Sequence, residues 1–167
     1  MTDLDAIAAA VVTQLNNSAA EWSPLSFTAR FDDAPNFTTD DLEDLTVVVV
    51  PNNVVIAPFR KAMPGQPTGT RLRGVEHYDN VICVFVAQKG PAAETGTDPL
   101  IAWSAARRLL VQKMGRWFNH RANRNPTGSV KLHGAPEHAP LYDMQELTNN
   151  RNWLSMIRLT YSNYERE

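Results

Sequence analysis

Apolar and polar residues recur along this chain with two different periods, and each period predicts a different kind of element. In residues 3–17, apolar side chains return every three to four positions, which is typical of an amphipathic helix. Residues 98–121 repeat this spacing over a longer stretch, and the pair Asp98-Pro99 suits a helix start. On this longer helix we expect two separate stripes. The apolar stripe holds Trp103, Ala106, Leu110, Met114 and Trp117, and the polar one holds Arg108, Gln112, Arg116 and His120.

Four other stretches have the two-residue alternation or the apolar runs of β-strands. Residues 25–31 alternate cleanly, with Leu25, Phe27, Ala29 and Phe31 on one face. Four consecutive valines at 47–50 predict a strand covered on both faces, and we expect it to continue, bent or bulged, through residues 54–59. The remaining two strands are expected at 75–87 and 152–162.

The order of these elements predicts an α+β fold in one domain spanning residues 1–167. Only one helix separates candidate strands, so we expect a mostly antiparallel sheet of about four strands with two helices packed on one face. Long loops are expected at 61–74, which is rich in glycine, proline and basic residues, and at 123–140.

Charge is nearly balanced over the chain but unevenly distributed along it. Residues 1–50 hold nine acids and a single arginine, a net charge of −8, whereas residues 51–136 carry a net charge of +8. Such segregation produces opposed surface patches if folding keeps the segments apart, and opposed patches steer association. If folding interleaves the segments, the patches cancel.

Several protein classes do not fit the sequence. No apolar run approaches the ~18 residues of a membrane span. The acidic start, Met1-Thr2-Asp3-Leu4-Asp5, lacks the basic region of a signal peptide, and the single Cys83 has no partner for an internal disulfide. We therefore expect a soluble globular domain made in the cytoplasm.

The sequence contains no convincing catalytic, metal or cofactor site. The glycines and arginines of residues 65–74 do not lie between a strand and a helix as a phosphate-binding loop requires. The four histidines are scattered, and Cys83 lies in an apolar strand that favours a buried packing role. We expect no enzyme activity and no cofactor.

The most informative surfaces are an acidic turn and a basic helix. The turn carries Asp40, Asp41, Glu43 and Asp44, for which a solvated face or a contact patch is the expected role. On the helix, Leu109 projects among arginines, which favours a protein contact over a plain solvated face or a nucleic-acid site, although all three remain open. The candidate contact residues on this helix are Arg107, Arg108, Leu109, Arg116 and Arg121.

The layout resembles the tail terminator and tail-completion proteins of tailed bacteriophages. The features that carry this resemblance run in order along most of the chain. They are the opening helix, the strand Phe27-Thr-Ala-Arg-Phe31, the acidic turn Asp41–Leu45 before Val47–Pro51, Arg60 before the strand Val75–Ala87, a helix, and the closing Trp153, Ile157, Leu159 and Tyr161. The loops at 61–74 and 123–140 have no place in this pattern.

The resemblance implies a structural virion protein. Such a protein forms a homohexameric ring that caps the tail tube, stops its polymerisation and joins it to the head or neck, while DNA passes through the lumen without sequence readout. The implied partners are further copies of the chain, the tail tube protein and a head or neck connector protein, with no membrane involved. In a ring with heterologous contacts, the acidic segment Asp40–Asp44 would meet the basic helix Arg107–Arg121 of a neighbour. The alternatives are a head-completion or neck adaptor protein, a small enzyme or nucleic-acid-binding domain, and an unassigned interaction module.

Overall fold

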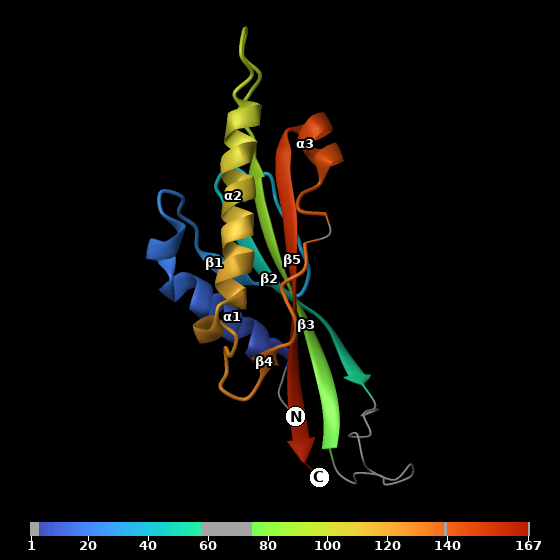
Figure 1. Cartoon of the computed structure of the whole chain (residues 1–167). Coiled ribbons are helices and arrows are strands. Elements are labelled where there is room, and N and C mark those ends of the chain that lie inside the picture. Colours follow the sequence, from blue (N-terminus) through green and yellow to red (C-terminus); the bar gives the residue numbers. More distant parts are fainter. Residues whose placement is uncertain (1–3, 58–74, 139, 167) are drawn as a thin grey trace, which may run out of the picture.

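A computed structural model describes residues 4–57, 75–138 and 140–166 and confirms the α+β class (Figure 1). The expected loop 61–74 and Arg60 lie outside the described residues. The elements are α1 (Leu4–Asn17), the 3₁₀ turn η1 (Ala19–Trp22), β1 (Ala29–Phe31), β2 (Thr46–Ala57), β3 (Val75–Lys89), α2 (Leu100–Asn119), the 3₁₀ turn η2 (Arg121–Asn123), β4 (Lys131–Leu132), α3 (Met144–Asn150) and β5 (Asn152–Arg166).

The sheet has five strands in the described residues, in the order β1-β2-β3-β5-β4, rather than the expected four. Its centre is the antiparallel pair β3 and β5, which stays in register from Val75 opposite Arg166 to Lys89 opposite Asn152. β2 pairs antiparallel with the other edge of β3, and only β1 runs parallel to its neighbour. The sheet is therefore mostly antiparallel, as predicted.

β2 joins the two strand segments expected at 47–50 and 54–59 into one strand, which is described as far as Ala57. The pairing with β3 shifts between Pro51 and Asn53, which is a bulge at the proline. Proline has no backbone N–H for the ladder, so bulges and edges are where sheets accommodate it. The four valines before it are buried on both faces of the sheet, as their apolar run predicts.

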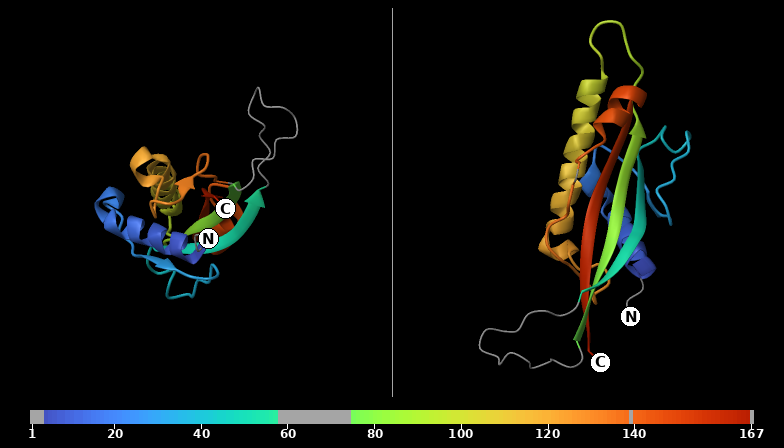
Figure 2. Two further views of the ribbon diagram at one scale, coloured as in Figure 1. Left: turned by 90° about the horizontal axis from the view of Figure 1, so that it is seen from below. Right: turned by 90° about the vertical axis from the view of Figure 1, so that its right-hand side faces the viewer.

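α1 and α2 pack against one face of the sheet and share one core with it. The buried side of α1 contributes Ile7 and Val11, and that of α2 contributes Val111 and Phe118. α1 lies over β1 and β2, whereas α2 lies along β5 (Figures 1 and 2). The two expected helices are thus present on the same face.

A third helix, α3, was not expected. It lies at the start of β5, where Asp143 caps it by accepting hydrogen bonds from the backbone N–H groups of Gln145 (2.9 Å) and Glu146 (3.0 Å). The Asp143-x-x-Glu146 spacing is a helix-start signal in the sequence itself. Tyr142, just before the cap, stacks on Trp153 of β5 at 4.5 Å and holds the short helix to the sheet.

The expected loop at 123–140 is more ordered than its composition predicts. It begins at the last residue of η2 and contains the two-residue strand β4, and Glu137 forms an isolated bridge with Arg158 of β5. Leu132 is buried, and His138 lies against Gly115 of α2, where any side chain would collide with the imidazole. The segment therefore lies along the outer edge of β5 instead of forming a free loop.

The strand expected at 25–31 is paired only at its end, as β1. Residues 25–28 have no partner strand, although Leu25 and Phe27 still turn toward the core. The Asn16 side chain of α1 takes the place of a partner at Ala29: its Oδ1 accepts the Ala29 N–H at 2.7 Å and its Nδ2 donates to the Ala29 carbonyl at 3.0 Å. Phe31, expected on the buried face, is instead 39% exposed.

The start of α2 is tied to the end of α3. Asp98 accepts the Leu100 N–H at 3.0 Å, as a capping residue does, and Pro99 directly precedes the first helical residue. The same carboxylate accepts two hydrogen bonds from the guanidinium of Arg151, at 2.8 and 3.0 Å. These bonds lower the pKa of Asp98 to about 2.

We predict that Asn16→Ala lowers the free energy of unfolding by about 1 kcal/mol, because the two backbone groups of Ala29 lose their partner. Chemical denaturation followed by circular dichroism measures this change. Asn17→Ala is the matched control, since Asn17 is the next residue of α1 and is exposed to solvent. Equal effects of the two substitutions would contradict the role given to Asn16.

Candidate interaction surface

The outer side of α2 carries the basic stripe predicted from the sequence. Arg108 and Arg116 are exposed, whereas Leu110 and Met114 on the apolar stripe are buried. Two large apolar residues also face solvent on this helix: Ile101 is 78% exposed and Leu109 is 65% exposed. Within the described part of the chain, the side chains of Arg108 and Arg116 have no hydrogen-bond or ion-pair partner.

Arg107 differs from its neighbour Arg108, because its side chain is already held inside the chain. Its Nε and Nη2 donate to Oε1 of Gln88 on β3, at 3.0 and 2.8 Å. The guanidinium lies 4.4 Å from the centroid of the Trp103 ring, and burial lowers the pKa of Arg107. This arginine therefore joins α2 to the sheet and is not available to a partner in the way that Arg108 is.

A trough runs along one flank of α2, between the helix and the segment of residues 17–28. Three adjoining hollows form it, and each shares residues with the next: Lys113 joins the first two, and Pro24 and Leu25 join the last two. The hollow at the C-terminal end of α2, about 630 Å³, has the basic residues Lys113 and Arg116 on its wall.

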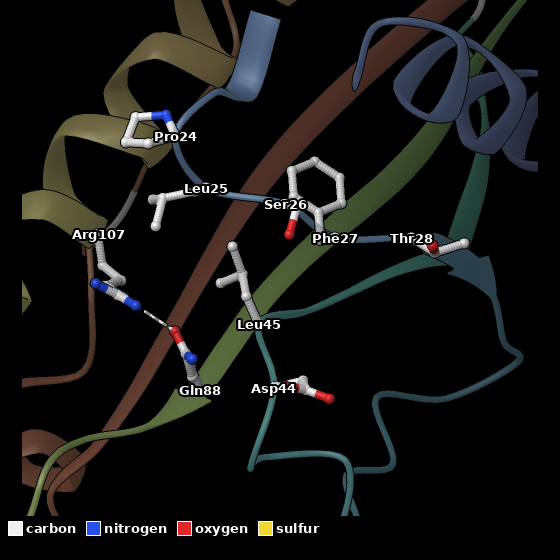
Figure 3. Close-up of a pocket in the computed structure, with 9 residues that line it drawn as sticks. All are labelled: Pro24, Leu25, Ser26, Phe27, Thr28, Asp44, Leu45, Gln88 and Arg107. Atoms are coloured by element: carbon white, nitrogen blue, oxygen red, sulfur yellow. Dashed lines mark hydrogen bonds between the residues drawn. The ribbon is translucent and has the colours of Figure 1, made fainter. Parts of the chain in front are cut away.

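The middle hollow of the trough is apolar. It measures about 250 Å³ and is lined by Trp22, Pro24, Leu25, Ala106, Leu109 and Lys113 among others. The third hollow, about 620 Å³, lies toward the N-terminal end of α2 and is polar. Figure 3 shows Arg107 bonded to Gln88 at one side of this hollow, with Leu45 and Asp44 on a neighbouring segment and Leu25 on the segment that runs from Pro24 to Thr28.

Trp22 fixes the position of the segment that forms the second wall of the trough. Its ring is buried, its Nε1 donates to the Leu15 carbonyl at 3.2 Å, and it meets the ring of Trp117 on α2 edge-on at 5.3 Å. Phe27 lies against the other side of Trp22, with the ring centroids 5.8 Å apart. The wall is thus anchored to both α1 and α2, which makes the trough a preformed surface.

In the acidic segment, Asp41 is bound within its own chain. Its carboxylate accepts two hydrogen bonds from Arg30, at 2.6 and 3.2 Å, and further bonds from the N–H (2.9 Å) and hydroxyl (2.8 Å) of Thr38. The Arg30 guanidinium, and then Thr38, hold the pKa of Asp41 well below its usual range. Asp41 therefore organises the turn, and it also neutralises the only arginine among residues 1–50.

The other acids of this segment face solvent. Asp33, Asp40, Glu43 and Asp44 are exposed, and no described residue pairs with their carboxylates. Most of the loop from Asp32 to Glu43 lies on the side of the sheet away from α2 (Figure 2). Asp44, which follows this loop, lies closer to the helix, because it lines the polar hollow of the trough together with Arg107.

Arg121, the remaining predicted contact residue, lies just past the end of α2, in η2. It is exposed and has no side-chain partner among the described residues. With Arg108 and Arg116 it leaves three uncompensated positive charges along the helix and the turn that follows it.

The described residues contain no group of three or more histidine, cysteine or acidic side chains placed to hold a metal ion. Cys83 is buried in β3, as expected, and burial raises the pKa of its thiol. No helix among these residues is long and apolar enough to cross a membrane.

No protein-family model matches the sequence, and a search of curated proteins finds no match either.

Sequence reasoning found the helix face but missed the trough beside it. Nothing in the pattern placed residues 22–25 against Leu109, because that contact depends on the packing of Trp22 on Trp117. The one available signal was a tryptophan and a proline in a short segment after a helix, which is common in loops of any kind.

We predict that Arg107→Ala lowers the free energy of unfolding by about 1–2 kcal/mol, because Gln88 loses its charged partner and Trp103 loses the stacked guanidinium. Arg108→Ala is the matched control and should stay within about 0.5 kcal/mol of the wild type. Denaturant unfolding of the two variants measures both values. A stability loss in Arg108→Ala as large as that in Arg107→Ala would contradict the assignment of Arg107 to the fold and of Arg108 to the solvent-exposed surface.

Proposed function

We propose that this chain is a structural virion protein, not an enzyme, which assembles into a ring at the end of a bacteriophage tail tube. The ring, which is homohexameric in the family that the sequence resembles, ends polymerisation of the tube and joins it to a head or neck connector protein. DNA passes through its lumen without sequence readout. This role places the finished protein in the virion, after synthesis in the host cytoplasm.

The observation that carries the proposal is the pair of complementary surfaces on one domain. Arg108 and Arg116, with the exposed Leu109 between them, face solvent on α2. Asp40 and Glu43 are exposed in the loop between β1 and β2, most of which lies away from α2 (Figure 2). Two different patches that match each other on separate sides produce heterologous contacts between copies, and such contacts close into rings when the rotation permits.

The exposed Leu109 favours a protein partner over a nucleic acid for this helix face. Leu109 is 65% exposed in the middle of the basic stripe, beside the apolar middle hollow. Phosphate contacts gain nothing from an apolar side chain, whereas the centre of a protein interface does. The alternative of an unassigned interaction module does not require an acidic surface that complements the basic one.

The decisive experiment grows tubes from the tail tube protein of the same phage, with and without this chain, and images them by electron microscopy. We expect shorter tubes with additional density at one end, because a ring on the tip blocks further subunits. Tubes of unchanged length with bare ends would contradict the terminator role. Density that appears only on the head connector would instead support the alternative role of a head-completion or neck adaptor protein.

The two patches can be tested against each other by charge reversal. We expect Arg108→Glu with Arg116→Glu to weaken self-association at least tenfold, because like charges then face each other across every contact. Asp40→Lys with Glu43→Lys should partly restore association in that background. Asp41 is left intact because it holds the turn through Arg30.

Sedimentation velocity in low and high salt measures this association. If the free chain is monomeric, the same variants are compared for binding to the tail tube. Wild-type association should fall as salt rises, since both patches are exposed and are screened. Assembly that is unchanged in the arginine variant, or that is not restored in the combined variant, would contradict the pairing of the two patches.

A further inference from the structure

No described residue fills the apolar middle hollow of the trough, and the residues that line the hollow indicate what kind of group would fit. Leu109 on one rim is 65% exposed, and the walls from Trp22, Pro24 and Leu25 are apolar. The hollow holds about 250 Å³, below the ~300 Å³ at which pockets for drug-sized ligands begin. It therefore suits a single large apolar side chain better than a small-molecule ligand.

The rim of this hollow is positively charged on one side. Lys113 lines both the middle hollow and the neighbouring one, and its ammonium group is held by the Glu21 carbonyl. Two cations, Lys113 and Arg116, and one acid, Glu21, line that neighbouring hollow. Arg116 follows one turn later and has no partner in the described chain. A matching segment would carry an apolar side chain with a carboxylate about one helical turn away.

Phe31 and the residues after it have this combination. Phe31 ends the edge strand β1 and is 39% exposed, although its place in the strand pattern predicts burial. Asp32 and Asp33 follow directly, and the Asp33 carboxylate is exposed and unpaired within the described residues.

The spacing of the two partners agrees. Phe31 and Asp33 are two residues apart, so their Cα atoms lie at most about 7 Å from each other. Along α2, Leu109 is about 6 Å from Lys113 and about 10 Å from Arg116 at 1.5 Å per residue. An aromatic ring beside Leu109 would therefore bring the following carboxylate within reach of the two cations.

We propose that Phe31 of one copy of this chain occupies the middle hollow of the next copy, with Asp33 facing Lys113 and Arg116 of that copy. This contact rests on the proposed self-assembly and names its centre: an apolar anchor surrounded by opposite charges. We choose a second copy as the partner because the acidic segment after Phe31 and the cations beside the hollow are complementary in charge, and each copy of the chain carries both.

Cross-linking between two differently tagged copies tests the contact directly. One copy carries Phe31→Cys and the other carries Leu109→Cys, and a short bis-maleimide joins thiols that lie close together. The copies are mixed alone and with growing tail tubes. We expect the product that carries both tags to form at least ten times more efficiently than in the control, in which the second copy carries Ile101→Cys.

Ile101 is a suitable control position because it is 78% exposed on the same helix and does not line the trough. The wild-type chain measures any contribution from Cys83, which is buried. Cross-linking that is equal at positions 101 and 109 would overturn the proposed contact.

A second measurement uses polar substitutions in place of cysteines. Phe31→Ser and Leu109→Ser should each weaken self-association at least tenfold, whereas Ile101→Ser should leave it within twofold of the wild type. If the wild type forms rings and caps tubes but Phe31→Ser assembles normally, the contact is wrong and the proposed function stands. If the wild type assembles neither alone nor on tubes, the proposed function fails and this contact fails with it.

Discussion

The antiparallel pairing of β3 with β5 is the interaction on which the rest of this structure depends. All fifteen residues of each strand take part, from Val75 opposite Arg166 to Lys89 opposite Asn152, although the two strands are far apart in the sequence. Such a pairing gives one continuous apolar face, because side chains at every second position share it. Both long helices pack on that face, and the edge strands extend it.

The parts of the fold that the sequence predicts are those in which a strong period repeats over many residues. α1, α2, β3 and β5 are all of this kind. The buried side of α2 was predicted only in part: Leu110 and Met114 are buried as expected, but Val111 and Phe118 are buried with them, whereas Trp103, Ala106 and Trp117 are only half-buried. β4 and α3 were missed because they are two and seven residues long, too short for a period to appear. Phe31 shares a face with the buried Ala29 but is more exposed than expected, because it ends a short strand at the edge of the sheet and has fewer neighbours there.

The candidate surface shows a different limit. Helical spacing places Arg107 and Arg108 at adjacent positions of one basic helix, yet Arg107 bonds Gln88 of β3 and Arg108 faces solvent. The distinction depends on which strand passes beneath the helix, and that is set by pairing between distant segments. Asp41 is a similar case, because its bond to Arg30 spans eleven residues across a turn that the acidic composition does not specify.

Folding could have cancelled the charge segregation of the chain, and the structure shows how far it did so. Arg30 neutralises Asp41, and Arg151 from the last third of the chain pairs with Asp98. Neither pair joins the acidic loop to the basic helix, so in the described chain the charges of these two segments do not pair with each other. Exposed carboxylates and guanidinium groups are well solvated and cost the monomer little, so their separation is stable by itself. In the assembly that we propose, the two sets of charges gain strength only where a contact excludes water, and the apolar hollow beside Leu109 is where such a contact would centre.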